Sequence, residues 1–130
     1  MSTWVGIGTS KETDSLRAAR QAAILAKAGT KQDKIDLAVI FCSVYYRPES
    51  VLAGIKQIMP EAKIVGCSSF GTITSDGIEK SGLAILAIKS QNIKFGLGCS
   101  SNINEKDSRS AGQELAAIAL SGLESGKREI

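Results

Sequence analysis

The fold of this chain is decided by residues 36–67, which read DLAVIFCSVYYRPESVLAGIKQIMPEAKIVGC. The first eight residues form a continuous apolar run, which predicts a strand that is covered on both faces. Pro48 suits the first turn of a helix, and aliphatic residues keep helical spacing from position 51 until Pro60. Residues 63–67 predict a second buried strand. Strand, helix and strand in this order indicate parallel strands joined by a crossover helix.

The residues before this stretch supply another strand and helix. Residues 3–8 predict a strand, and Thr13 or Asp14 can cap a helix that Gly29 would end. The chain therefore starts with a βαβαβ pattern. Its fold class is predicted to be α/β with an open mixed sheet.

The residues after position 66 predict antiparallel hairpins and a final helix. Asp76-Gly77 is a turn signal between two short strands. Residues 82–89 and 93–99 predict two longer strands around the polar turn 90–92. Asp107 or Ser108 can cap the last helix, which is predicted to end before Gly122.

The two ends of the chain resemble each other. WVGIGTSKETDSLRAARQAAILA, from Trp4, matches KFGLGCSSNINEKDSRSAGQELAAIAL, from Lys94, if the second loop is three residues longer. The aligned pairs are Gly6 with Gly96, Gly8 with Gly98, Ser10 with Ser100 and Ala18 with Ala111. A buried strand follows the first helix, whereas GKREI follows the last one. We therefore expect residues 1–130 to be a single α/β domain that is the N-terminal part of a longer module; the alternative is a short relative whose missing strand comes from elsewhere.

Composition excludes several classes of protein. A chain of 130 residues with a net charge of +3 and scattered lysines lacks the basic stripe of a nucleic-acid-binding face. The apolar run Leu83–Ile88 is far too short to span a bilayer, and the first ten residues do not form a secretory signal. The sequence therefore predicts a cytoplasmic protein without membrane insertion, in which the three cysteines are reduced thiols.

Neither a metal nor a cofactor is predicted. The chain contains no histidine, and Cys42, Cys67 and Cys99 include no CxxC pair that could start a zinc site. Gly6-Ile7-Gly8 follows a strand, but the third glycine of a dinucleotide-binding loop is absent. Glycines that let strand ends approach closely explain this motif better.

Small polar residues follow three predicted strands, and we expect them to form a ligand site, because ligands of open α/β sheets bind outside the carboxyl ends of the strands. Arg47 could hold a carboxylate, with Tyr45 or Tyr46 as a wall; the alternative is that the tyrosines are half-buried packing residues and Arg47 is solvated. The predicted ligand-binding residues are Gly8, Thr9, Ser10, Ser43, Tyr45, Tyr46, Arg47, Cys67, Ser68, Ser69 and Thr72.

Cys67 is also a candidate nucleophile, because it lies just beyond a strand beside the hydroxyl groups of Ser68 and Ser69. A reactive thiol needs a helix N-terminus or a cation that lowers its pKa. No helix signal follows Cys67 directly, so a thiol-dependent enzyme is the second hypothesis. A third hypothesis is an interaction module that forms a homodimer through an exposed sheet edge.

The order of these motifs resembles the FIST sensory domains, named for F-box and intracellular signal transduction proteins. The resemblance rests on GIGTSKETDSLRAARQAA, the FCS strand end before PESVLAGIKQIMP, IVGCSSFGTI, SGLAILAI and FGLGCS with its helix. The family pattern often reads close to GCSTAGEI, from which this chain departs at Phe70 and Thr72.

The resemblance implies a ligand-binding sensory module that occurs with signalling proteins or domains and takes small molecules such as amino acids. It supplies no catalytic set. The chain is therefore expected not to be an enzyme.

Overall fold

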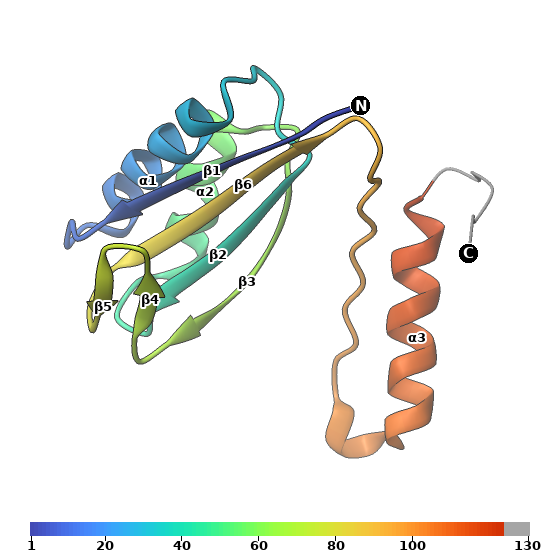
Figure 1. Cartoon of the computed structure of the whole chain (residues 1–130). Helices are drawn as coiled ribbons and strands as arrows, with labels where there is room; N and C mark the ends of the chain where they lie inside the picture. The colour runs from blue at the N-terminus through green and yellow to red at the C-terminus, as the bar shows by residue number, and fades with distance from the viewer. Residues whose placement is uncertain (124–130) are drawn as a thin grey trace. The chain divides into compact units, whose positions relative to one another are not determined.

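The computed structural model describes residues 1–123 and divides the chain into a unit of residues 1–93 and a second unit that begins at Lys94. The first unit contains β1 (Thr3–Ser10), α1 (Ser15–Thr30), β2 (Leu37–Ser43), α2 (Pro48–Ile58), β3 (Lys63–Ser69), β4 (Thr72–Thr74), β5 (Gly77–Glu79) and β6 (Leu83–Ser90). The second unit contains the short 3-10 helix η1 (Ile103–Glu105) and the helix α3 (Ser108–Ser121) (Figure 1). The predicted α/β class with its βαβαβ start and final helix is confirmed.

The main sheet of the first unit has four strands in the order β1-β6-β2-β3. Strand β6 is antiparallel to both of its neighbours, whereas β2 and β3 are parallel. Strands β1, β2 and β3 therefore run in the same direction and end at the same edge, and the sheet is mixed, as predicted. Strands β4 and β5 form the predicted short hairpin around Asp76-Gly77, as a separate two-stranded sheet.

Helices α1 and α2 cover one face of this sheet, and the hydrophobic core lies between them and the strands (Figure 1). The buried core residues include Ala19, Ala22, Ala23, Ala26, Ala38, Ile40, Val51, Ile55, Leu83 and Ile85. The predicted burial of residues 63–67 is wrong, since no residue of β3 is buried. The prediction that β2 is covered on both faces is also wrong for the residues described. Phe41 alternates with the buried residues Ile40 and Cys42, and 44% of it is exposed. It points to the face that carries neither helix.

Helix α1 lies directly against β1 because glycines leave no side chain between the two backbones. A Cβ atom on Gly6 would lie 2.0 Å from the carbonyl oxygen of Ala26, and one on Gly8 would lie 1.9 Å from that of Ala22. Gly29 does not end the helix as predicted. The helix continues to Thr30, Lys31 takes the left-handed conformation (φ 56°), and Gly29 packs against Gly6 instead.

The second predicted hairpin does not form. Strand β6 pairs with β1 and β2 instead, and residues 93–99 do not form a strand in the described part of the chain. The last helix begins as predicted, since the Asp107 side chain accepts a hydrogen bond from the backbone N–H of Ser110 at 3.0 Å.

An ion pair fixes the sheet edge opposite the carboxyl ends of β1, β2 and β3. The Asp36 carboxylate contacts Lys89 Nζ at 2.7 Å and accepts a hydrogen bond from the backbone N–H of Ser90 at 2.9 Å. Burial alone would raise the pKa of Asp36, but these hydrogen bonds and the charge of Lys89 outweigh it, and the pKa is lowered. Asp36 therefore joins the start of β2 to the end of β6.

Replacing Gly8 with alanine should destabilise the first unit by about 3 kcal/mol, because the new methyl group would collide with a backbone carbonyl that cannot move alone. The matched control is Gly71→Ala, whose methyl group would lie 3.5 Å from the nearest atom, an ordinary contact. Urea unfolding of the full chain measures the free energy of unfolding of both variants. Equal stability of the two variants would contradict this packing.

Asp36→Asn should lower the free energy of unfolding by about 1 kcal/mol at pH 7, because it removes a partly buried charged partner. The pKa of Asp36 is depressed in the folded state, so its stabilisation is complete above the ordinary aspartate pKa of about 4 and is lost as the pH falls through the folded-state pKa. The difference from wild type should therefore shrink below about pH 4. The exposed Asp33, changed to asparagine, is the control, and a difference that stays constant down to acid pH would refute the assignment.

Candidate functional site

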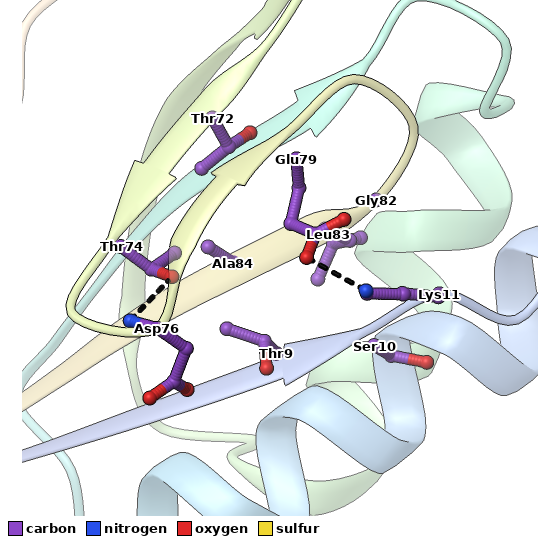
Figure 2. A pocket seen from close by; sticks show the side chains of 10 residues that line it. All are labelled: Thr9, Ser10, Lys11, Thr72, Thr74, Asp76, Glu79, Gly82, Leu83 and Ala84. Carbon is purple, nitrogen blue, oxygen red and sulfur yellow. Dashed lines mark hydrogen bonds and ion pairs between the residues drawn. The ribbon is translucent and has the colours of Figure 1, made fainter.

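A cavity of about 300 Å³ lies where the β4–β5 hairpin meets the end of β1 and the start of β6 (Figure 2). The hairpin reaches this position because β4 contacts both β2 and β6. The cavity is therefore at the carboxyl ends of the parallel strands, where a ligand site was predicted. It is lined by Thr9, Ser10, Lys11, Thr72, Thr74, Asp76, Glu79, Gly82, Leu83 and Ala84.

The charged groups of the cavity come from two loops that are distant in the sequence. Lys11 follows β1, and its Nζ forms an ion pair with Glu79 Oε1 of β5 at 2.7 Å (Figure 2). Asp76 lies in the hairpin turn, where its backbone N–H donates to Thr74 Oγ1 at 3.2 Å. One cation and two carboxylates therefore line a single small cavity.

The hydroxyl groups of Ser10 and Thr74 already form hydrogen bonds within the protein. Ser10 Oγ donates to Gln21 Oε1 of α1 at 2.8 Å and accepts from the backbone N–H of Glu12, so it fixes the turn after β1. Thr74 Oγ1 donates to the Gly77 carbonyl at 3.4 Å and holds the hairpin turn. Thr72 is buried. Thr9 of β1 and Thr72 of β4 add two further hydroxyl-bearing residues to the lining.

Three of the predicted site residues, Thr9, Ser10 and Thr72, line this cavity. Gly8 lies one residue away, and its contact with Ala22 assigns it a packing role. Ser43 is buried at the end of β2, where its backbone N–H donates to the Gly82 carbonyl at 2.9 Å. Gly8 and Ser43 therefore position the walls of the cavity without lining it.

The segment after β2 supports the cavity from outside. Tyr46 donates from its hydroxyl group to the Glu12 carbonyl at 2.7 Å, and burial, followed by the nearby Cys42 and Glu12, raises the pKa of Tyr46. The backbone N–H of Arg47 donates to Ser15 Oγ at 3.0 Å, and Tyr45 is 83% exposed. Tyr45, Tyr46 and Arg47 do not line the cavity, so their predicted role in binding stays a prediction.

The three predicted residues of β3 also lie outside the cavity. Cys67 and Ser68 are exposed on this edge strand, and Ser69 Oγ donates to the Gly71 carbonyl at 2.7 Å. Cys42, on the neighbouring strand, is buried; burial, followed by the nearby Cys67, raises the pKa of Cys42. The structure thus places the two thiols in different surroundings.

Sequence reasoning missed the residues that give the cavity its charge, Lys11, Asp76 and Glu79. It also missed Thr74, Gly82 and the first two residues of β6, Leu83 and Ala84. The Asp76-Gly77 turn signal located the hairpin correctly. Nothing local indicated that β6 inserts between β1 and β2, which brings Gly82 to Ala84 to the same edge as Ser10.

Residues 1–123 contain neither a candidate metal cluster nor a candidate membrane span. No group of three or more cysteine and carboxylate side chains there is placed to hold a metal ion. No helix in the same part of the chain is long and apolar enough to cross a membrane.

A family model described as the FIST N domain matches residues 36–128. No curated protein matches the chain. Among solved structures, an FtsZ mutant from M. jannaschii is similar with a TM-score of 0.44 and 18% identity, and the match covers 68% of this chain and 27% of that one. An FtsZ-like protein of unknown function from Nostoc punctiforme PCC 73102 has a TM-score of 0.34 and 17% identity, with 68% of this chain and 89% of that one covered. Similarity at this level supports no functional statement.

The accessibility of the thiols gives a direct test of this arrangement. Cys67 and Cys99 are exposed and Cys42 is buried with a raised pKa, so iodoacetamide should modify Cys42 at least about tenfold more slowly. Mass spectrometry of peptides after timed alkylation measures each site, and the urea-unfolded chain, in which all three should react alike, is the control. Rapid modification of Cys42 in the native chain would show that the β2 end is open.

Proposed function

We propose that this chain, which belongs to the FIST N domain family, is a small-ligand-binding sensory domain of an intracellular signal transduction protein. FIST domains are sensory domains of signalling proteins, so the family gives the general role. The finer parts of the proposal are the ligand, an amino acid or similar small metabolite, and a cytoplasmic location. The observation that carries it is the cavity of about 300 Å³ in which charges of both signs meet.

The residues of the cavity suit a ligand that carries both an ammonium and a carboxylate group. Asp76 and Glu79 can accept hydrogen bonds from an ammonium group, and Lys11 can pair with a carboxylate. The hydroxyl groups of Thr9 and Thr72 add neutral donors and acceptors, while Leu83 and Ala84 provide apolar surface. A few polar groups on a partly apolar wall are typical of small-molecule sites.

A charged ligand can bind in the cavity by replacing the two partners of the Lys11–Glu79 ion pair. The Lys11–Glu79 ion pair is well exposed on the lysine side, where 70% of the side chain is accessible. Such pairs contribute at most about 1 kcal/mol. A zwitterionic ligand can replace Glu79 as the partner of Lys11 and Lys11 as the partner of Glu79. The protein then loses only the small stabilisation that this ion pair provides.

A thiol-dependent enzyme centred on Cys67 has weaker support. Catalysis by a thiol needs a neighbouring cation or helix N-terminus and a substrate cavity beside it. Cys67 is exposed on β3, and the cavity is lined by other residues. We therefore propose a non-enzymatic role in which signalling proteins or domains are the partners, without nucleic acid. A homodimer through an exposed sheet edge stays a prediction.

A calorimetric and thermal-shift screen of the twenty amino acids and related metabolites tests the proposal on the full chain and on a longer version that includes any following residues. At least one compound should raise the unfolding temperature. Asp76→Asn should weaken its binding about tenfold, because the ammonium loses a charged partner.

Glu61→Gln is the matched control for this variant, since Glu61 carries the same charge and pairs with Lys34 away from the cavity. Its affinity should equal that of the wild-type chain. Failure of every compound to stabilise either version, or equal binding by the Asp76→Asn variant, would reject the site.

A further inference from the structure

The charges that line the cavity do not balance. The lining, which belongs entirely to the first unit, contains one cation, Lys11, and two carboxylates, Asp76 and Glu79. Lys11 and Glu79 already neutralise each other in their ion pair at 2.7 Å. The Asp76 carboxylate forms no ion pair within residues 1–123. The cavity therefore keeps one negative charge, which a neutral amino acid would not offset.

The hairpin turn fixes the position of Asp76. Its backbone N–H donates to Thr74 Oγ1 at 3.2 Å, and Thr74 Oγ1 in turn donates to the Gly77 carbonyl at 3.4 Å. Gly77 has a φ of 127°, which residues with a side chain rarely adopt. Figure 2 shows the Asp76 side chain directed from this turn toward β1. Asp76 is exposed, so its carboxylate lies at the mouth of the cavity.

Asp76 and the Lys11–Glu79 ion pair lie at opposite ends of the cavity (Figure 2). Asp76 is three residues before Glu79, and at about 3.3 Å per residue their Cα atoms are at most about 10 Å apart. The buried Leu83 and Ala84 supply apolar surface to the lining. A ligand that reaches both ends therefore needs a second polar group at the end of an aliphatic chain, and beside Asp76 that group must be a cation.

We propose that the ligand is a basic amino acid, with a second ammonium group at the end of an aliphatic side chain; this inference rests on the proposed function. Its α-carboxylate pairs with Lys11 and its α-ammonium with Glu79, while its terminal ammonium pairs with Asp76. The aliphatic chain lies on Leu83 and Ala84. Because Asp76 is exposed, the terminal ammonium keeps part of its hydration and its desolvation cost is small.

Three other classes of ligand fit the same charges less well. A neutral amino acid leaves Asp76 without a partner, and an acidic one places a second carboxylate beside it, where like charges repel. A diamine without a carboxylate can pair with Asp76 and Glu79, but it takes Glu79 from Lys11 and gives Lys11 nothing in return. The basic amino acid supplies a partner for each of the three charged groups.

Calorimetric titration of the full chain with L-lysine, L-norleucine and cadaverine tests the ligand class. Norleucine has the aliphatic chain of lysine without the terminal ammonium, and cadaverine is lysine without the carboxylate. L-lysine should bind at least about tenfold more tightly than either, because each of them loses one charged pair.

Equal affinities of lysine and norleucine would overturn this inference and leave amino-acid binding intact. Equal affinities of lysine and cadaverine would overturn the assignment of Lys11. If no amino acid binds, the proposed function fails together with the inference.

The Asp76→Asn variant tests which residue reads the terminal ammonium. It should weaken binding of L-lysine at least about tenfold and leave that of norleucine unchanged, so that the preference for lysine disappears. Glu61→Gln, which removes the same charge away from the cavity, should keep the preference. An equal loss for both ligands in Asp76→Asn would indicate that Asp76 only shapes the turn, and an unchanged preference would place the terminal ammonium elsewhere. Either result would overturn the assignment.

Discussion

The close approach of α1 to β1 is the constraint on which the first unit depends. Gly6 and Gly8 let the carbonyl oxygens of the helix come nearer to the strand than any side chain would permit. The buried alanines of α1 carry only a methyl group each, so the helix backbone can lie close to the sheet. Because the helix is held so tightly, the end of β1 and the turn after it have a defined position. Ser10 then joins that turn to α1 through Gln21.

The candidate site is assembled from segments that are joined by a few polar contacts. Tyr46 ties the segment after β2 to Glu12, and the backbone of Ser43 ties the end of β2 to Gly82. Lys11 and Glu79 join the turn after β1 to the hairpin. The Tyr46 contact is partly buried and Ser43 is buried, whereas the lysine of the ion pair is open to solvent. The site therefore combines fixed walls with one charged contact that a ligand can replace.

Local patterns predicted what depends on local chemistry. The strands β2 and β3, Pro48 at the start of α2, the Asp107 cap and the Asp76-Gly77 turn were read correctly, because each depends on contacts within a few residues. The predicted burial of β2 on both faces and of β3 was not correct. The strand order was not predictable in this way, since an apolar run indicates a strand and not which strand lies beside it. The insertion of β6 between β1 and β2 sets the strand order of the sheet, and it also places Leu83 and Ala84 in the cavity. The role of Tyr46 was equally unpredictable, because its hydroxyl group donates to a backbone carbonyl, and every residue type carries one.

NMR mapping of an amino acid identified by the screen tests whether the cavity at the end of β1 is the ligand site. Binding in the cavity predicts that shifts of backbone amides concentrate on residues 9–11, 72–79 and 82–84, the segments that line the cavity. Shifts that concentrate on Tyr45, Arg47 and Cys67 to Ser69 instead would contradict it, and would place the ligand at the strand ends that lie outside the cavity.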